Sequence, residues 1–267
     1  MQSAAHGKTE HLCPMRRINV FNSLISLGTY QSFIDEIFSF ATLKTPSYVC
    51  FANVHMVVEA YHDKSFQRLV NEANLVAPDG KPLSAFLKLA AGIKQDRVCG
   101  MDILPDVLRQ AESLGKSVYF YGSTEELLKT IVQKASKEFP LLRIAGYCSP
   151  PFRALSEKED HEITAAINQA QPDLVFVSLG CPKQERWMAE HRYKVNACLL
   201  GLGQAFKVYA GVERRLPKWM HNLSLEWVFR LYQEPGRLWK RYLFTNSFFL
   251  FLVTRHFTAQ LFQKLGL

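Results

Sequence analysis

The chain has 267 residues, of which 48% are hydrophobic and 21% are charged, a composition typical of a folded globular protein with one large domain or a domain plus an appendage. Six cysteines are scattered without any CxxC spacing, which argues against a zinc site or a disulfide scaffold and favours a reducing compartment. The net charge is +8, and residues 212–267 hold nine Lys and Arg against three acids. We therefore expect a partner that carries phosphates, with nucleic acid, anionic lipid and a nucleotide sugar all open.

Predicted strands and helices alternate along the chain. After a polar segment at residues 1–14, residues 16–24 form a first strand or hairpin. Further strands are predicted at residues 48–52, 75–77, 118–121, 142–145, 174–179 and 197–200. Helices are predicted at residues 32–43, 55–71, 81–91, 124–139 and 157–169, and another begins at Asp102, a good N-cap residue.

This alternation predicts an α/β fold, with a mostly parallel, Rossmann-like sheet and helices on both faces. After Gly211, helical patterns continue without strands. We therefore assign residues 1–211 to an α/β core and residues 212–267 to a basic, aromatic-rich helical appendage. The first twenty residues lack the apolar core of a signal peptide, and the longest apolar stretch, residues 242–253, is shorter than the ~20 residues of a spanning helix. We expect a peripheral protein at the cytoplasmic face of the membrane.

One stretch near the middle of the chain, residues 172–185, carries a predicted binding feature. Residues 174–179 are apolar and rich in β-branched side chains, as in a strand that is buried on both faces. Gly180-Cys181-Pro182 ends the strand, and three polar residues, Lys183, Gln184 and Glu185, follow. Ligands bind at the carboxyl ends of parallel strands, but a solvated polar loop fits this pattern equally well.

Asp79 directly follows a short apolar strand, where a carboxylate can serve as a general base if it reaches an acceptor hydroxyl, although the pattern alone favours a turn residue. The surrounding Pro78-Asp79-Gly80 is also a common turn sequence. The glycines of Gly122-Ser123 and of Gly201-Leu202-Gly203 can let the backbone approach a diphosphate or sugar. They fit tight turns as well, and no complete GxGxxG fingerprint is present.

The sequence has no DxD, no HExxH and no His/Cys cluster. A metal-dependent sugar transferase usually needs paired carboxylates to hold its divalent ion. If the protein handles a nucleotide diphosphate, arginine is the natural replacement, because its guanidinium binds phosphate oxygens bidentately. The C-terminal segment is rich in arginine.

Aromatic and basic residues interleave in this C-terminal segment. The pattern is compatible with an interfacial membrane helix, with stacking on nucleic acid, or with a packed pair of helices whose Arg side chains extend to solvent. The residues concerned are Trp219, Trp227, Phe229, Tyr232, Trp239, Tyr242, Phe244, Phe248, Phe249 and Phe251 with Arg230, Arg237, Lys240 and Arg241.

Several motifs together resemble one family, the WecG/TagA/CpsF glycosyltransferases, bacterial enzymes that extend undecaprenyl-diphosphate-linked sugars. The resemblance runs from about residue 16 to about residue 245. The matching residues are Asn53, Ala77-Pro78-Asp79-Gly80, Arg97-Val98-Cys99-Gly100-Met101-Asp102, Tyr121-Gly122, Pro172-Asp173, Leu179-Gly180-Cys181-Pro182-Lys183-Gln184-Glu185, Gly201-Leu202-Gly203, Ala210-Gly211, Arg214-Arg215-Leu216-Pro217, Leu225-Glu226-Trp227-Val228-Phe229-Arg230-Leu231, Glu234-Pro235 and Arg237.

The resemblance implies an inverting transfer from a UDP-sugar to an undecaprenyl-diphosphate-linked sugar, without metal or cofactor, in cell-surface polysaccharide or teichoic acid assembly. The typical donor of the family is UDP-N-acetylmannosamine. Asp79 aligns with its proposed general base, and Arg230 and Arg237 are implied to neutralise the UDP leaving group. The implied substrate-binding residues are Asn53, Gly80, Arg97, Gly100, Asp102, Gly122, Gln184, Gly203 and Gln204.

Three positions depart from the family pattern and leave the donor sugar open. Phe51 stands where Thr is usual, Lys207 follows Phe206 where Asp is usual, and Gln204 replaces a small residue. The donor sugar is therefore N-acetylmannosamine or a plain hexose such as glucose.

Two alternatives from other classes remain, a non-catalytic UDP-sugar-binding scaffold or sensor and a nucleic-acid-binding protein. The acids scattered through residues 1–211 and the lack of a recognised module weigh against nucleic acid as a partner. Assembly into a homo-oligomer is left open.

Overall fold

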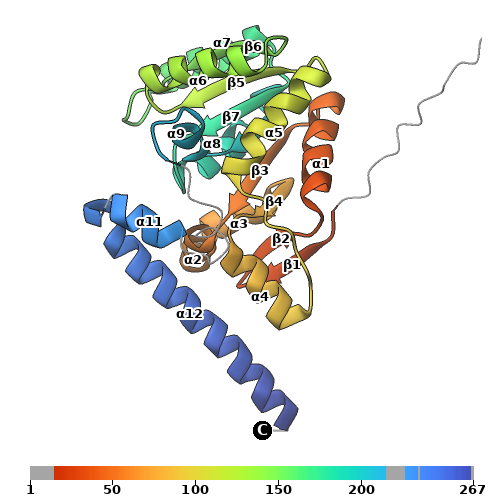
Figure 1. The fold of residues 1–267 in the computed structure, drawn as a ribbon, viewed down its shortest axis with the longest axis vertical. Helices are drawn as coiled ribbons and strands as arrows, with labels where there is room; N and C mark the ends of the chain where they lie inside the picture. Colours follow the sequence, from red (N-terminus) through yellow and green to blue (C-terminus); the bar gives the residue numbers. More distant parts are fainter. Residues whose placement is uncertain (1–14, 215–225, 234, 266–267) are drawn as a thin grey trace, which may run out of the picture.

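The computed structural model describes residues 15–214, 226–233 and 235–265, except for the side chains of Glu226, Arg230, Gln233, Arg237 and Leu265. Its centre is a six-stranded sheet in the order β4-β3-β8-β7-β5-β6, in which every neighbouring pair is parallel (Figure 1). The strands are β3 (Ser47–Ala52), β4 (Leu75–Pro78), β5 (Ser117–Gly122), β6 (Arg143–Cys148), β7 (Leu174–Ser178) and β8 (Cys198–Gly201). The predicted parallel α/β fold is confirmed.

Helices cover both faces of the sheet, as predicted. One face packs against α1 (Tyr30–Leu43), α5 (Gly100–Ser113), α6 (Glu125–Glu138) and α9 (Ala205–Tyr209). The other packs against α2 (Val54–His62), α3 (Lys64–Glu72), α4 (Lys81–Ala91), α7 (Glu157–Ala170) and α8 (Lys183–His191). Side chains along each strand point alternately to the two faces of the sheet. In β3, Val49 and Phe51 pack on the face that α1 and α5 cover, whereas Tyr48 and Cys50 pack on the opposite face.

The first predicted element is a hairpin rather than a single strand. Its strands β1 (Arg17–Val20) and β2 (Ser23–Ser26) pair antiparallel. Phe21 and Asn22 connect them and both have positive φ, 49° and 69°, as the two central residues of a type I′ turn require. The hairpin joins the core next to β4, where the Val76 amide donates to Ser26 Oγ at 3.1 Å.

Three local predictions were wrong because capping and helix initiation differ from the expected pattern. The single helix expected at residues 55–71 is two helices, since Asp63 is extended and its Oδ1 accepts from the amides of Ser65 and Phe66 at 2.8 and 3.1 Å. Asp102 is not an N-cap; it lies in the first turn of α5, which begins at Gly100 after Cys99. For the polar residues 183–185, a ligand-binding strand end and a solvated loop were both open, and the loop is wrong because these residues begin α8.

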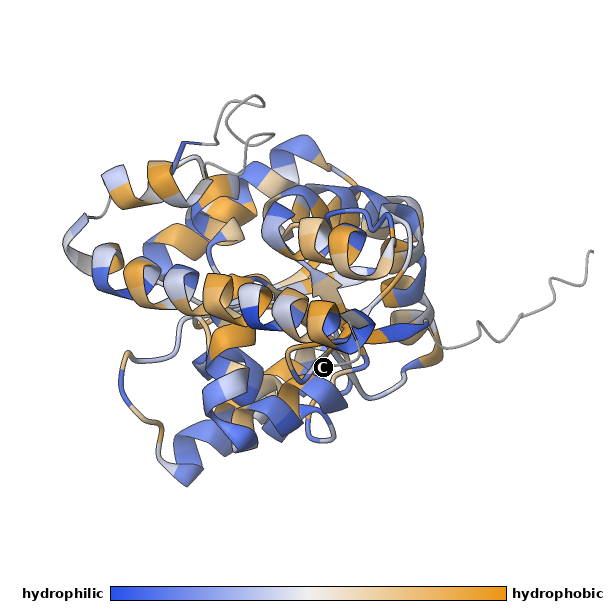
Figure 2. Ribbon diagram, turned by 90° about the horizontal axis from the view of Figure 1, so that it is seen from below, coloured by the Kyte–Doolittle hydropathy of each residue, from blue (hydrophilic) through white to orange (hydrophobic). Residues whose placement is uncertain are grey.

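The C-terminal segment forms α11 (Glu226–Gln233) and α12 (Pro235–Leu265), and α12 runs beside α2 at the edge of the core (Figure 1). One face of α12 is buried, and Phe249 on this face belongs to the hydrophobic core; the buried residues are Leu238, Tyr242, Thr245, Phe249 and Leu252. Hydrophobic and hydrophilic residues interleave along it (Figure 2). Within the described ranges, no helix combines the length and the apolar character needed to span a membrane.

Candidate active site

A cleft of about 610 Å³ opens where several parallel strands end, and α11 and α12 contribute to its lining. Phe51 of β3, Asp79 after β4, Ser178 of β7 and Gly201 of β8 all line it. Such a volume is in the range of pockets that hold nucleotide-sized ligands. The position is the carboxyl edge of the sheet, where a ligand was expected from the sequence.

Asp79 is the one carboxylate among the described residues of this lining. Its backbone is held by the sheet, because its amide donates to the Ala52 carbonyl at 2.8 Å. Gly80 follows with φ of 109° and precedes α4, but it does not line the cleft itself. A side chain at position 80 would be strained in this backbone conformation, so Gly80 fixes the path of the chain directly after Asp79.

Asn53 lines the cleft at the end of β3 and also caps α2. Its Oδ1 accepts from the Met56 amide at 3.1 Å, so this oxygen is already engaged in the cap. Gly100 lines the cleft at the start of α5. Both residues thus line the cleft at the beginning of a helix.

Arg97 and Asp102, both expected to bind substrate, form an ion pair with each other. Arg97 Nη2 lies 2.7 Å from Asp102 Oδ2, and the Arg97 side chain is 12% exposed. Arg97 lines the cleft, whereas Asp102 does not. Asp102 therefore holds the guanidinium of Arg97 at the cleft.

Gly122 does not line the cleft and is explained by strand packing. Its φ is 104°, and a Cβ there would lie 2.3 Å from the carbonyl oxygen of Ser178 on β7. The next residues, Ser123 and Thr124, do line the cleft. Only glycine lets the end of β5 lie this close to the backbone of β7. The chain then continues to Ser123 and Thr124 at the cleft.

Gln184 and Glu185, in the first turn of α8, are among the most buried polar residues at this edge, with exposed fractions of 5% and 0%. Gln184 Nε2 donates to Glu185 Oε1 at 2.7 Å and to the Gly201 carbonyl at 3.1 Å. Burial raises the pKa of Glu185 to about 7, even though the hydrogen bond from Gln184 lowers it. Gln184 lines the cleft, whereas Glu185 does not.

Gly203 and Gln204 line the cleft, and so does Lys207. Lys207 Nζ lies 3.1 Å from Glu213 Oε1, and Gln204 Nε2 donates to Glu213 Oε2. Phe51 is 4% exposed and belongs to the core as well as to the cleft lining. All three positions that depart from the family pattern therefore face the same cleft.

Sequence reasoning did not assign two cationic residues, Lys81 and Arg241, to the binding site. Lys81 at the start of α4 and Arg241 of α12 line the cleft together with Arg97 and Lys207. Among the described lining residues, four Lys and Arg side chains thus face one carboxylate, Asp79. Two of the four, Arg97 and Lys207, are paired with Asp102 and Glu213, carboxylates outside the lining. The cations still outnumber these acids and Asp79 by one, which suits an anionic ligand. Helical spacing could have indicated Arg241, because it shares a face of α12 with the buried Tyr242 and Thr245.

His55 of α2 also lines the cleft and was not predicted. Burial, and after it the positive charge of Arg241, lower the pKa of His55 to about 4. The imidazole is therefore neutral at neutral pH and adds no charge to the site. The side chains of Arg230 and Arg237, expected at the leaving group, lie outside the described part of the structure.

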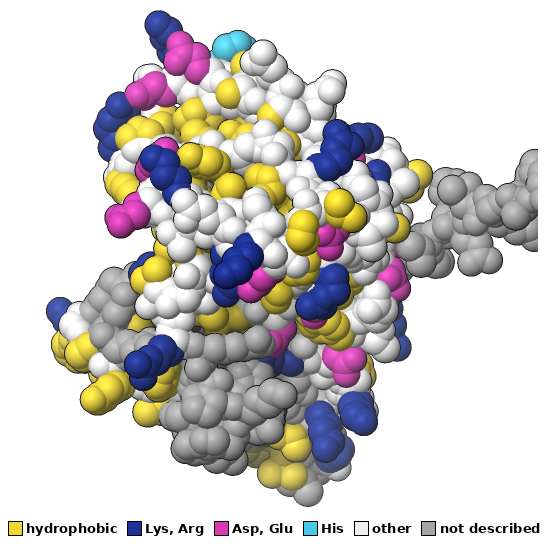
Figure 3. All heavy atoms as spheres, turned by 45° about the horizontal axis from the view of Figure 1, so that its top comes forward, with side chains coloured by type: hydrophobic (Ala, Val, Ile, Leu, Met, Phe, Trp, Pro, Cys, Tyr) yellow, Lys and Arg dark blue, Asp and Glu magenta, His cyan; other side chains and the backbone are white. Residues whose placement is uncertain are grey.

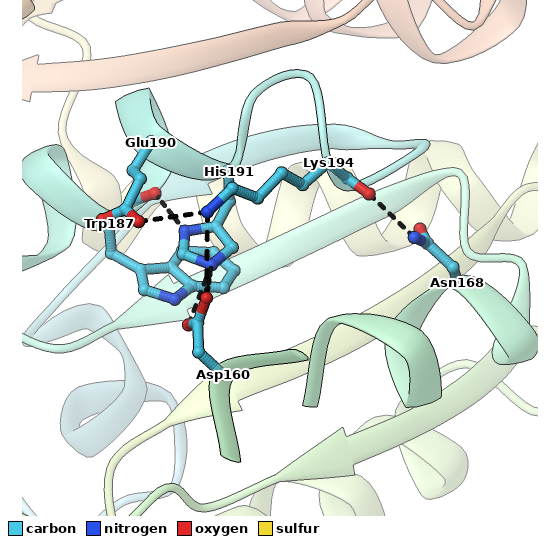
Figure 4. Close-up of polar contacts among 6 residues, drawn as sticks. All are labelled: Asp160, Asn168, Trp187, Glu190, His191 and Lys194. Atoms are coloured by element: carbon cyan, nitrogen blue, oxygen red, sulfur yellow. Dashed lines mark hydrogen bonds and ion pairs between the residues drawn. The ribbon is translucent and has the colours of Figure 1, made fainter. Parts of the chain in front are cut away.

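One group of possible metal ligands lies outside the cleft lining. In the described ranges, Asp160, Glu190 and His191 are the residues close enough to share an ion (Figure 4). His191 is buried; its Nδ1 lies 2.8 Å from the Trp187 carbonyl and its Nε2 2.9 Å from Asp160 Oδ1. Lys194 Nζ lies 3.0 Å from Glu190 Oε1 and 3.9 Å from Asp160 Oδ2. Because the group contains its own cation, we interpret it as an ion-pair network that joins α7 to α8.

Comparison with known proteins supports the resemblance. Residues 18–262 match the sequence model of the glycosyl transferase WecG/TagA/CpsF family. An N-acetylglucosaminyldiphosphoundecaprenol N-acetyl-beta-D-mannosaminyltransferase from Bacillus subtilis (strain 168) is 33% identical over 215 residues, 79% of this chain and 81% of the relative. Enzymes of the same name from Bacillus spizizenii and from Staphylococcus aureus (strain MW2) are 30% and 25% identical over 198 residues, 74% and 73% of this chain and 75% and 73% of the relatives. The chain thus belongs to the WecG/TagA/CpsF family of glycosyltransferases.

Proposed function

We propose that the protein transfers a sugar from a UDP-sugar to a polyprenyl-diphosphate-linked sugar, with inversion at the anomeric carbon. The observation that carries this proposal is the cleft itself, in which one carboxylate faces an excess of Lys and Arg at the carboxyl edge of the sheet. A sugar nucleotide needs this combination, because its diphosphate is anionic and the acceptor hydroxyl must lose a proton. The similar enzymes carry an acceptor of this class in their names.

In the proposed reaction, Asp79 takes the proton from the acceptor hydroxyl as that oxygen attacks the anomeric carbon. The bond from this carbon to the diphosphate oxygen breaks, and UDP leaves with the bonding electrons on its oxygen. Attack from the face opposite the leaving group inverts the configuration. Arg241 and Lys81, which line the cleft, stabilise the charge that develops on the diphosphate, together with Arg230 and Arg237 as the family resemblance implies.

Independence of a metal ion is part of the proposal. A divalent ion usually takes several carboxylate and carbonyl ligands, and Asp79 is the one carboxylate that the described residues bring to the cleft lining. We expect EDTA to leave the transfer rate unchanged. Strong inhibition by EDTA that magnesium reverses would contradict this part of the proposal without touching the role of Asp79.

We also propose that the segment at residues 212–267 is an appendage that places the cleft at an anionic membrane surface, on the cytoplasmic face. Opposite its buried face, α12 exposes Leu243, Leu250 and Leu261, each more than half accessible. Exposed Lys240, Arg255 and Lys264 lie among these apolar residues. A helix with apolar residues and flanking cations on its outward face suits the boundary between headgroups and acyl chains. The substrate-binding cleft lies beside this helix, where a lipid-linked acceptor is within reach.

The donor sugar is N-acetylmannosamine or a hexose such as glucose. The names of the relatives favour N-acetylmannosamine, whereas Phe51 and Lys207 alter the cleft lining. Phe51 supplies no hydroxyl, and Lys207 brings a cation that is paired with Glu213. A screen of UDP-sugars against a synthetic lipid-diphosphate-sugar, with the product linkage determined, tests the reaction and chooses the donor. UDP-sugar binding without any product would instead favour the non-catalytic scaffold or sensor.

The face of the molecule drawn in Figure 3 gives no support to the nucleic-acid alternative. On the face drawn in Figure 3, Lys and Arg side chains alternate with Asp and Glu rather than forming one basic patch. Polynucleotide binding depends on such a patch or stripe of positive charge. Transfer to a lipid-linked acceptor therefore remains the function that the cleft supports best.

A further inference from the structure

We propose that Glu185 is a positioning residue that orients the Gln184 amide, so that Gln184 Oε1 accepts a hydrogen bond from a hydroxyl or amide N–H of the bound sugar. This inference rests on the proposed sugar transfer and adds a role for a residue that does not line the cleft. It depends on the contacts of two adjacent side chains at the start of α8 and on two glycines of the facing strand end.

The orientation of the Gln184 amide follows from its partners. One end of the amide faces two acceptors, the Glu185 carboxylate oxygen at 2.7 Å and the Gly201 carbonyl oxygen at 3.1 Å. A backbone carbonyl can only accept, so the NH₂ group must be the end that faces both oxygens. The carbonyl Oε1 is consequently turned away from Glu185 and Gly201.

Gln184 Oε1 is buried and has no hydrogen-bond partner among the described residues. Gln184 nevertheless lines the cleft, with 5% of its surface exposed. A buried acceptor without a partner costs about 1–3 kcal/mol, a cost that a donor on a bound ligand removes. Sugar hydroxyls and the acetamido N–H are donors of this kind, so we assign Oε1 to the sugar rather than to the anionic diphosphate.

Two glycines create the space for this side chain. A Cβ at Gly201 would lie 3.2 Å from Gln184 Nε2 and 2.6 Å from Met188 Cε, and a Cβ at Gly203 would lie 3.2 Å from Gln184 Oε1. Gly203 also has a φ of 50°. The Gly-x-Gly sequence that indicated backbone approach to a ligand thus admits the Gln184 amide between strand β8 and helix α8.

Glu185 fixes this orientation because it is completely buried and cannot exchange its partner for water. Without its carboxylate, the NH₂ group of Gln184 keeps the Gly201 carbonyl as its one described acceptor. The amide is then held by one acceptor instead of two, so the orientation in which Oε1 faces the sugar is less strongly favoured. The expected consequence is weaker transition-state binding with the fold retained.

The experiment compares wild type with E185M, E185Q, Q184A and the double variant Q184A/E185M, using the UDP-sugar that the donor screen identifies. Methionine keeps the approximate volume of Glu185 but accepts no strong hydrogen bond, whereas the amide oxygen of glutamine still accepts from Gln184 Nε2. We expect E185M to lower kcat/KM about tenfold, as the loss of one such hydrogen bond does. E185Q should recover most of that loss.

The double variant separates positioning from a general structural role. If Glu185 acts through Gln184, adding E185M to Q184A lowers kcat/KM no further. Thermal unfolding midpoints measured for all four variants identify any that are destabilised. Independent, multiplicative losses in the double variant, or an E185Q as slow as E185M, would overturn the positioning role while wild-type turnover keeps the transfer reaction intact. A wild type that makes no product from any UDP-sugar would instead reject the proposed function.

Discussion

His55 of α2 and Arg241 of α12 line the same cleft, and burial together with the charge of Arg241 lowers the pKa of the His55 imidazole to about 4. This relationship links the α/β core to the C-terminal helix at the level of single side chains. Because His55 stays neutral at neutral pH, Arg241 meets no opposing imidazolium. Arg241 belongs to α12, the helix whose outward face we assign to the membrane, so this helix brings a guanidinium to the cleft.

Replacing Asp79 by asparagine should reduce transfer about 10²–10⁴-fold, the range by which a positioned base accelerates such a step. Asparagine keeps the size of the side chain and the backbone hydrogen bond to Ala52, so the thermal unfolding midpoint should change little. D35N is the matched control, because Asp35 is exposed on α1 and lies outside the cleft lining. Near-normal turnover of D79N in a coupled UDP-release assay would exclude Asp79 as the base.

Replacing Arg241 by glutamine should lower kcat about 10²-fold, because one charged donor to the departing diphosphate is lost. Lys240, its exposed neighbour on α12, does not line the cleft, and K240Q is the control. An NMR titration supplies a second measurement: without the charge of Arg241, the pKa of His55 should rise toward its ordinary value of 6.5. Unchanged kcat with a raised His55 pKa would place Arg241 in the cleft without a role at the leaving group.

Substituting Leu243, Leu250 and Leu261 by serine should weaken binding to anionic vesicles about 100-fold, since partial burial of three leucines supplies about 3 kcal/mol. These side chains are exposed, so the fold should be unaffected. A triple serine variant at Leu43, Leu114 and Leu141 removes three exposed leucines from the core domain and serves as the control. Equal pelleting of both triple variants with vesicles containing phosphatidylglycerol would contradict membrane docking through α12.

Glu185 should make stability fall as pH rises. Its pKa of about 7, against an ordinary 4.5, means that the folded chain binds this proton more tightly than the unfolded chain. The resulting stabilisation is fully present below pH 4.5 and is lost as pH rises through 7, by about 3 kcal/mol. Urea unfolding of wild type and E185Q measures it: the difference in unfolding free energy should shift by that amount between pH 4.5 and pH 8.

The comparison with E185Q is needed because His55 has the opposite sign. Its lowered pKa gives stability that is present above pH 6.5 and lost as pH falls toward 4. Both proteins contain His55, so its contribution cancels in the difference. A difference that does not depend on pH would mean that Glu185 titrates at its ordinary value.

The elements of the fold were largely predictable because their signals are local. The buried run of β7 and the apolar periodicity of α1 and α6 identify strands and helices from a few consecutive residues. Asp63 was overlooked as a helix start because its capping signal lies inside a continuous apolar pattern. A solvated loop stayed open for residues 183–185 because nothing local signals the burial of Gln184 and Glu185. Lys183 is exposed, and Gln184 is buried where its amide contacts Gly201 of β8.

The sequence by itself determined the fold class, the motifs of the family and Asp79 as the candidate base, because strand periodicity and motif spacing are properties of consecutive residues. The tertiary structure alone decided which charges meet. It paired Arg97 with Asp102 and Lys207 with Glu213, brought Arg241 to the cleft beside His55, and buried Glu185 behind Gln184. His55 and Arg241 lie far apart along the chain and share the cleft only because α12 packs against α2. The other pairs are close in sequence, but their geometry and burial depend on how separate strands and helices pack, which no local pattern encodes.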